Sequence, residues 1–151
     1  MKHFIVTSCS LIDFYQLIKI KRNTLHQMEN KALYFPSSDF SILQYLCLPK
    51  HFICGIKINN KLVAFSTVFF KKGIYLIEDT VVAKKYWGNG MQIKMWLYIL
   101  SSIPSGSILM CTIHPSNRYS LNNAIALGFR IIDKQIMYNN VERYILLHTK
   151  Q

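Results

Sequence analysis

The alternation of apolar and polar residues predicts a chain in which strands and helices are mixed. Apolar residues recur at helix spacing in segments 10–22, 39–48, 91–100 and 116–127. Segments 4–6, 51–58, 61–70, 74–82, 107–113, 129–138 and 142–148 have the apolar, β-branched and aromatic content of strands. The predicted order, β-α-α-β-β-β-α-β-α-β-β, favours a mixed α/β (α+β-like) fold with one sheet and helices on its faces.

Turn and capping residues separate these elements. Ser10 and Asp13 resemble a capping pair at a helix start, and Pro49 ends a helix. Asn59-Asn60 suits a two-residue hairpin turn, because asparagine tolerates positive φ. Gly128 is typical of a glycine that closes a helix. Repeats, linkers and low-complexity segments are absent from the sequence, so we expect a single domain over residues 1–151.

Composition excludes several classes of protein. The chain has 151 residues, of which 51% are hydrophobic and 17% charged, so a folded core is expected. Apolar runs are far shorter than the roughly 20 residues of a membrane span, and the first run is too short for a signal peptide. We therefore expect a cytoplasmic protein without a membrane partner. The cysteines and histidines lack metal-binding spacing, which favours reduced thiols and no metal.

The charge widens the range of partners. Eighteen lysines and arginines against seven acidic residues give a formal net charge of +11. Such a field attracts anions, which include nucleic acid, anionic lipid and phosphorylated small molecules. A basic but merely solvated surface explains the same number equally well.

The stretch YWGNGMQ, residues 86–92, predicts a site for an anion. Gly88 and Gly90 lie between a strand that ends near Val82 and a helix that starts near Gly90. The unpaired amides at the start of a helix point at one place, next to the positive end of the helix dipole. Neither common nucleotide motif fits, because Met91-Gln92 replaces the Walker Lys-Ser/Thr and Ile93 replaces the third dinucleotide glycine. A plain strand-to-helix turn is the alternative.

The wider segment 75–100, YLIEDTVVAKKYWGNGMQIKMWLYIL, resembles the acetyl-CoA-binding motif of the GNAT superfamily of N-acetyltransferases, in particular its bacterial single-domain members. The family pattern is Arg/Gln-x-x-Gly-x-Gly/Ala before a helix. Here it falls on Trp87, Gly88, Asn89, Gly90, Met91 and Gln92. Gly90 matches, whereas Trp87 and Gln92 depart from the pattern. These departures weaken side-chain contacts to a pyrophosphate but leave the backbone cradle intact.

A second segment, 114–129, resembles the next motif of the same family. Its Asn-x-x-Ser and Gly-Phe pairs are Asn117, Ser120, Gly128 and Phe129 here. In the family this asparagine touches the pantetheine arm of the cofactor; capping of the helix is its alternative role. The resemblance is specific from residue 61 onwards. Residues 1–60 match only in element order, and in the family they usually build the acceptor pocket.

The resemblance implies the GNAT fold, a central twisted mixed sheet of six to seven strands with about four helices. It also implies acetyl-CoA as cofactor, held partly by strand backbone that splays from its neighbour. Val82 N–H is then a candidate oxyanion donor. The implied cofactor-binding residues are Thr80, Val81, Val82, Trp87, Gly88, Asn89, Gly90, Met91, Gln92, Ile93, Asn117 and Ser120.

Acetyl transfer to an amine also needs a proton acceptor. Glu78 and Asp79 are the adjacent acidic pair of this basic chain, and IEDTVV resembles the strand that carries active-site acids in glucosamine-6-phosphate N-acetyltransferases. We take both as candidate catalytic residues. Strand alternation sends their side chains to opposite faces unless a bulge intervenes, so at most one is expected to face the substrate.

A general acid is harder to assign. Many family members carry a tyrosine four residues before the Gly-Phe glycine, where this chain has Ala124. Tyr119, Tyr138, Ser120 or solvent are the alternatives. Cys111 is expected to be a core residue and not a nucleophile, because no activating partner is evident.

The predicted function is transfer of an acetyl group from acetyl-CoA to a primary amine of a small molecule, peptide or protein. Two alternatives stay open. The charge would suit an acetyltransferase directed at tRNA or another nucleic acid, and Ala124 leaves open an acyl-CoA-binding protein without catalysis. A monomer or a homodimer is expected.

Overall fold

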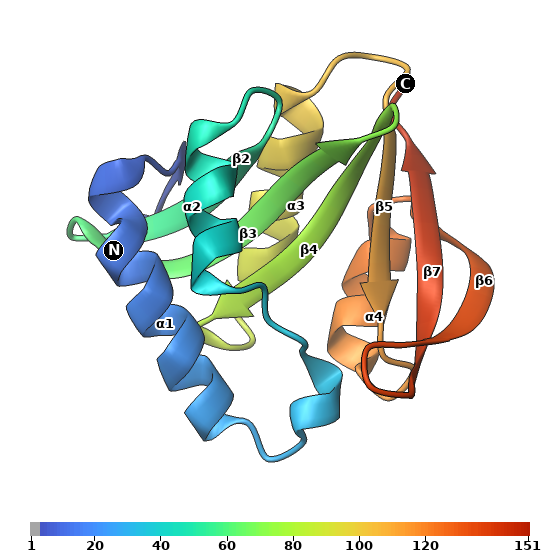
Figure 1. Ribbon diagram of the computed structural model, residues 1–151, viewed down its shortest axis with the longest axis horizontal. Coiled ribbons are helices and arrows are strands. Elements are labelled where there is room, and N and C mark those ends of the chain that lie inside the picture. Colours follow the sequence, from blue (N-terminus) through green and yellow to red (C-terminus); the bar gives the residue numbers. More distant parts are fainter. Residues whose placement is uncertain (1–3) are drawn as a thin grey trace.

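A single mixed sheet organises the protein. The computed structural model describes residues 4–151 and arranges seven strands in the order β1-β2-β3-β4-β5-β7-β6 (Figure 1). The strands are β1 Ile5–Ser8, β2 Phe52–Ile58, β3 Lys61–Lys71, β4 Ile74–Val82, β5 Ile108–Ile113, β6 Arg130–Met137 and β7 Val141–Thr149. β4 and β5 run parallel, whereas all other neighbours in the sheet are antiparallel.

Helices cover both faces of the sheet. They are α1 Phe14–Gln27, α2 Asp39–Cys47, α3 Met91–Ser102 and α4 Arg118–Ala126, with short 3-10 turns η1 Leu11–Asp13, η2 Lys31–Leu33 and η3 Lys84–Tyr86. In Figure 1, α1 and α2 lie in front of the sheet, and α3 and α4 lie behind it. The expected order of elements, the seven-stranded sheet and the four main helices are confirmed.

Each face has its own apolar core. Met95, Trp96 and Ile99 of α3 anchor the core behind the sheet. Leu17 of α1 and Ile42 of α2 anchor the core in front. The middle strands are buried from both sides, which explains why segment 61–70 is almost continuously apolar and does not alternate.

Most predicted turns are present, while one helix is longer than predicted. Asn59 and Asn60 have φ values of 50° and 60°, as the hairpin turn requires, and Gly128 after α4 has a φ of 86°. The N–H of Ser10 donates to Asp13 Oδ2 at 3.0 Å. The predicted helix 10–22 is instead a 3-10 turn followed by α1, which continues to Gln27 because neither proline nor glycine interrupts residues 23–27.

The parallel strands β4 and β5 separate after a short pairing. Ile74–Ile77 pairs with Ile108–Cys111, but β4 continues to Val82 and β5 to Ile113 without further pairing between these two strands. The two strands visibly diverge in Figure 1. The divergence leaves one backbone edge of β4 open, as the family resemblance implied.

A β-bulge lies in β4 where the strands separate. Ser66 pairs with Thr80 and Val68 pairs with Ile77, so Glu78 and Asp79 together lie opposite Thr67. An extra residue of this kind reverses the alternation beyond it. Both acidic side chains consequently lie on the face covered by α1 and α2, where they bond to Tyr34, Ser37 and Tyr45. The expectation for a regular strand, that the two acidic side chains point to opposite faces, is wrong here because of this bulge.

Candidate active site

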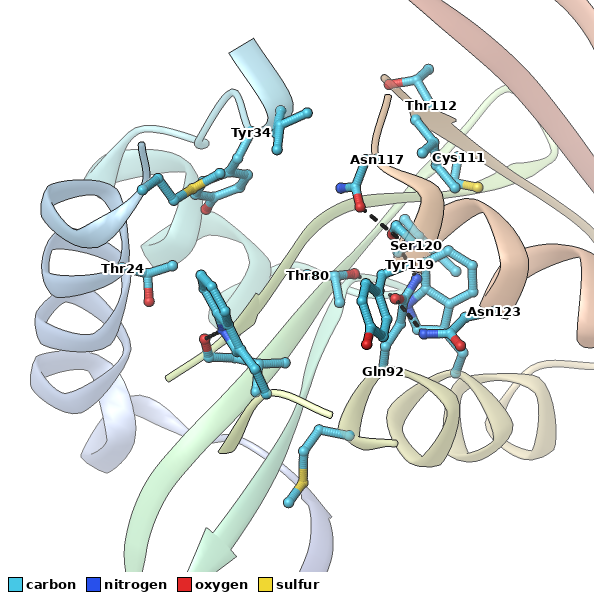
Figure 2. Close-up of a pocket in the computed structure, with 18 of the residues that line it drawn as sticks. Thr24, Tyr34, Thr80, Gln92, Cys111, Thr112, Asn117, Tyr119, Ser120 and Asn123 are labelled. Atoms are coloured by element: carbon cyan, nitrogen blue, oxygen red, sulfur yellow. Dashed lines mark hydrogen bonds between the residues drawn. The ribbon is translucent and has the colours of Figure 1, made fainter. Parts of the chain in front are cut away.

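A cavity of about 740 Å³ occupies the gap between β4 and β5. It is lined by the ends of both strands, the turn before α3, the first turn of α4, the end of α1 and η2. Figure 2 shows Thr24 and Tyr34 on one side, Asn117, Ser120 and Asn123 on the other, and Thr80 between them. The cavity therefore brings the two sequence motifs together with the N-terminal helical region.

The glycine turn presents open backbone to this cavity. Gly88 and Gly90 have φ values of 78° and 66°, which side chains rarely adopt, and a Cβ on either would meet nothing within 4 Å. The first helical hydrogen bond of α3 runs from Lys94 N–H to Gly90 O at 3.1 Å. The amides of residues 91–93 therefore precede the first helical hydrogen bond of α3 and lie next to the positive end of the helix dipole. This arrangement suits a phosphate.

Trp87 and Asn89 shape the turn. The indole Nε1 of Trp87 donates to Val82 O at 2.7 Å. Asn89 Nδ2 donates to the carbonyls of Tyr86 at 3.0 Å and Trp87 at 3.1 Å. Trp87 lines the cavity, whereas Asn89 does not. The tryptophan that departs from the family pattern thus fixes the end of β4 against the glycine turn.

The backbone of Val82 faces the gap between the strands. The N–H of Ala83 donates to Val63 O on β3 at 2.9 Å, so by alternation the polar groups of Val82 point away from β3. Val82 O accepts the Trp87 indole, which leaves the Val82 N–H directed at the cavity. Val81 is different. It pairs with Phe65 and is 1% exposed, so the structure does not support Val81 as a cofactor-binding residue.

Polar side chains connect α3 to α4 beside the turn. Asn117 caps α4, its Oδ1 accepting from Ser120 N–H at 3.2 Å. Gln92 Nε2 donates to Ser120 Oγ at 2.9 Å, and Gln92 Oε1 accepts from Asn123 Nδ2 at 3.0 Å. Of the residues predicted to bind the cofactor, Gln92, Asn117 and Ser120 line the cavity together with Thr80 and Met91, whereas Ile93 does not. Gln92, the second departure from the family pattern, holds the two helices together.

Among the residues that the structure describes, Glu78 is the acidic one that lines the cavity. Its Oε2 accepts hydrogen bonds from Tyr45 Oη and from Ser37 Oγ, the latter at 3.3 Å. These contacts hold the carboxylate against α2 while the residue stays exposed. A carboxylate held at the edge of an open cavity can accept a proton from a bound amine.

Asp79 is fully buried and does not line the cavity. Its Oδ1 accepts from Tyr34 Oη at 2.8 Å and from Ser37 N–H at 3.1 Å. Burial raises the pKa of this carboxyl, although the hydrogen bonds from Ser37 and Tyr34 oppose the rise. The structure gives Asp79 the task of positioning Tyr34, and a direct catalytic role is not supported.

The hydroxyl groups of the cavity differ in their surroundings. Tyr119 is 79% exposed and lines the cavity together with Ser120, whereas Tyr138 stacks on Phe35 with ring centroids 5.2 Å apart. Burial, with the nearby Asp79 carboxylate, raises the pKa of Tyr34 far above its usual range. Ala124 is fully buried in the core.

The thiol of Cys111 also lines the cavity, yet it does not have the surroundings of a nucleophile. Its side chain is 4% exposed, and burial raises its pKa. A raised pKa keeps the thiol protonated and unreactive. The prediction of a core residue agrees with this environment.

Several lining residues were not predicted from the sequence. Thr24 and Met28 lie beyond the predicted end of the first helix, and Leu33 and Tyr34 lie between the predicted helices 10–22 and 39–48. Thr112, Asn123 and Arg143 lie in predicted elements but match no position of either motif. A predicted first helix that continued to residue 28 would have included Thr24 and Met28. Arg143, in contrast, is placed at the cavity only by the three-dimensional structure.

Comparisons with known proteins agree with this architecture. No family model and no curated protein matches the sequence. Among solved structures, the chain is similar to the ribosomal-protein-S18-alanine N-acetyltransferase from Escherichia coli, with a TM-score of 0.80 and 15% identity over 96% of this chain and 92% of that one. A GNAT-family acetyltransferase from Bacillus cereus gives 0.80 and 16% over 99% of both chains.

A third similar structure contains the cofactor. It is a Salmonella typhimurium protein named as an acetyltransferase and solved with acetyl-CoA, with a TM-score of 0.74 and 10% identity over 97% of this chain and 93% of that one. The chain therefore has the fold of the GNAT acetyltransferases. Among the helices of residues 4–151, none is long and apolar enough to cross a membrane.

Proposed function

We propose that the protein is a GNAT-type N-acetyltransferase that transfers the acetyl group of acetyl-CoA to a primary amine. One observation carries the proposal. A single cavity joins the glycine turn before α3 to the gap between β4 and β5, so the amides at the start of α3 and an open strand edge are continuous. An acyl-CoA needs both features, because its pyrophosphate and its thioester lie at opposite ends of an extended arm.

The residues present fit this cosubstrate. The amides of residues 91–93 would hold the pyrophosphate, and the conformation of Gly88 and Gly90 leaves their approach unobstructed. The open edge of β4 and the side chain of Asn117 would hold the pantetheine arm. Acetyl-CoA supplies an activated acyl thioester.

Four groups of the chain would then serve the transfer. Glu78 would accept the proton of the amine, directly or through one water. Val82 N–H would donate to the carbonyl oxygen as negative charge develops on it. Tyr119 and Ser120 supply hydroxyl groups on the α4 side of the cavity, where the sulfur would need a proton. These roles follow from position and chemistry, and each is open to mutation.

The acceptor is proposed to be a primary amine of a small molecule, peptide or protein. The name of the Escherichia coli structure specifies an alanine of ribosomal protein S18 as its acceptor. The side of the cavity that we propose for the acceptor includes Thr24, Met28, Leu33 and Tyr34, which lie outside the segments that carry the family motifs.

Two measurements test the proposal. Thermal unfolding with and without CoA reports binding, and release of CoA from acetyl-CoA with a panel of amines reports transfer. Binding with amine-dependent release is the expected result. Binding without release for any amine would favour a non-catalytic acyl-CoA-binding protein, and no thermal shift at millimolar CoA would contradict the proposal. Nucleic acid that co-purifies and dissociates steeply with salt would favour the nucleic-acid-directed alternative.

A further inference from the structure

The wall of the cavity contains a buried positive charge. Arg143 of β7 lines the cavity although it is only 7% exposed. Its Nε donates to Thr112 Oγ1 at 3.1 Å and its Nη2 to Thr112 O at 3.3 Å, while the guanidinium lies 5.6 Å from the Tyr138 ring centroid. These contacts fix the guanidinium plane at the wall of the cavity.

Arg143 and Glu78 lie on the same face of the sheet. Along β7, the side chains of Tyr144 and Leu146 pack into the core behind the sheet. Because successive side chains of a strand point to opposite faces, Arg143 points to the front. Glu78 also points to the front, because it bonds to Tyr45 of α2. β4 carries Glu78 on one side of the gap, and β7, beyond β5, carries Arg143 on the other. Among the described residues that line the cavity, these two carry the charges.

From this juxtaposition we infer that the acceptor is an amino-acid-type zwitterion, a primary amine that carries a carboxylate on the same small molecule. The inference rests on the proposed function, because it assigns the acceptor of that same site. Glu78 receives the amine end, and the Arg143 guanidinium receives the carboxylate, for which its planar set of donors is well suited.

A guanidinium at the wall of the cavity favours an anion as ligand, because its planar donors form charge-assisted hydrogen bonds with a carboxylate. Burial lowers the pKa of Arg143 from its usual value, although Tyr138 and Cys111 oppose the change. The same guanidinium repels a purely cationic amine, so it selects against diamines as well as for amino acids.

A carboxylate on the acceptor also separates this site from one for a protein N-terminus. The first residue of a peptide carries a neutral amide where a free amino acid carries its carboxylate. If Arg143 binds that carboxylate, kcat/KM for free amino acids exceeds kcat/KM for their carboxamides and for peptides that offer their N-terminal amine. A series of ω-amino acids of increasing length measures which separation of amine and carboxylate the site prefers.

The test compares matched acceptors in matched variants. Release of CoA is measured with α- and ω-amino acids, their carboxamides, aminoalkyl phosphates and short peptides. In the wild-type protein, kcat/KM for the preferred amino acid should exceed that for its carboxamide by about tenfold to a hundredfold, as expected for a charge-assisted hydrogen bond. The carboxamide has the less basic amine and so more free amine near neutral pH, which makes this preference a stringent test.

Arg143→Gln should abolish the preference, mainly through a higher KM for the amino acid, because the contact is present before and during the reaction. Arg143→Lys should retain part of it. Arg130→Gln removes an exposed arginine of β6 and should change nothing, which controls for the loss of one positive charge. Thr112→Val removes only the acceptor of Arg143 Nε and should lower the preference a few-fold, so the test survives if Arg143→Gln does not fold.

Binding separates this inference from the proposed function. The Kd values of N-acetyl amino acids and their carboxamides are measured by calorimetry on the CoA-saturated protein and on the free protein, without turnover. Loss of all transfer would contradict the proposed function, while a carboxylate preference in binding that depends on Arg143 would still support the inference. An equal ratio of carboxylate to carboxamide in wild type and Arg143→Gln would overturn it. Higher kcat/KM for peptides or for aminoalkyl phosphates would overturn it too.

Discussion

The two sides of the cavity are built in different ways. The side assigned to CoA depends on backbone: two left-handed glycines, the amides at the start of α3 and the open edge of β4. The side assigned to the acceptor depends on side chains: Glu78, Tyr34 and Arg143. Backbone groups are present whatever the side chains are, so the first side tolerates substitutions that the second does not.

Trp87 and Gln92 illustrate that tolerance. Both depart from the family pattern, yet neither obstructs the amides before α3. Trp87 instead bonds to the end of β4, and Gln92 connects α3 to α4. A backbone site can thus keep its geometry while its side chains take structural tasks. The acceptor side lacks this tolerance, because substitution of Glu78 or Arg143 removes the chemical group itself.

The largest expected effect is on the backbone side. Gly90→Glu should abolish CoA binding, because it places bulk and negative charge where a phosphate meets the amides. In the wild type, CoA at about 100 times its Kd should raise the free energy of unfolding by about 2.7 kcal/mol. Gly106→Glu is the matched control, since Gly106 also has a positive φ and open space but lies outside the cavity. Unchanged CoA affinity in Gly90→Glu would place the phosphate site elsewhere.

The next largest effect is expected at Glu78. Glu78→Gln keeps the shape of the side chain and removes its basicity, so kcat should fall by about 10²–10⁴, the usual contribution of a general base. The CoA-induced thermal shift should be preserved, and the remaining rate should rise with pH as free amine becomes available. Steady-state kinetics from pH 6 to 9 provide the measurement. If kcat equals that of the wild type throughout, Glu78 has no part in proton transfer.

Asp79 should affect stability and its pH dependence. Its pKa in the folded protein is raised above the ordinary 3.8, so the folded state holds this proton more tightly than the unfolded chain. Stability from this group is present at low pH and is lost as pH rises above 3.8 through the folded pKa, by about 1.4 kcal/mol for each unit of the rise.

Two variants of Asp79 separate charge from hydrogen bonding. Asp79→Asn removes the titration and keeps an acceptor for Tyr34 Oη, so its stability should decline less with pH than that of the wild type. Asp79→Ala removes the acceptor as well and should cost roughly 1–3 kcal/mol. Urea unfolding at pH 4 to 8 measures both. A parallel pH profile for Asp79→Asn and the wild type would mean that the folded pKa is not raised.

The smallest effect is expected at the connection between α3 and α4. Gln92→Leu removes hydrogen bonds to Ser120 and Asn123 and should lower the free energy of unfolding by about 1 kcal/mol, with little loss of CoA binding. A double-mutant cycle with Ser120→Ala tests the contact directly. Strictly additive effects would show that this hydrogen bond does not couple the helices.

The difference between the two sides also decides what the sequence could predict. The strand, the glycine turn and the helix after it are consecutive in the chain, so local pattern and family resemblance placed them correctly. Arg143 and Glu78 come together only through the sheet order, in which β7 lies between β5 and β6. Tyr34 lies in a segment with weak periodicity, and its tie to Asp79 depends on the bulge. Contacts of this kind are not encoded in local spacing.

The bulge in β4 decides which side chains face the front of the sheet. Ile77 belongs to the core behind the sheet and Val81, four residues later, to the core in front, whereas a regular strand would place both on one face. Deletion of one residue between them would remove the bulge and leave Val81 facing the front, but the front face would then carry one acidic side chain fewer. The extra residue therefore supplies two carboxylates side by side, one that lines the cavity and one that holds Tyr34.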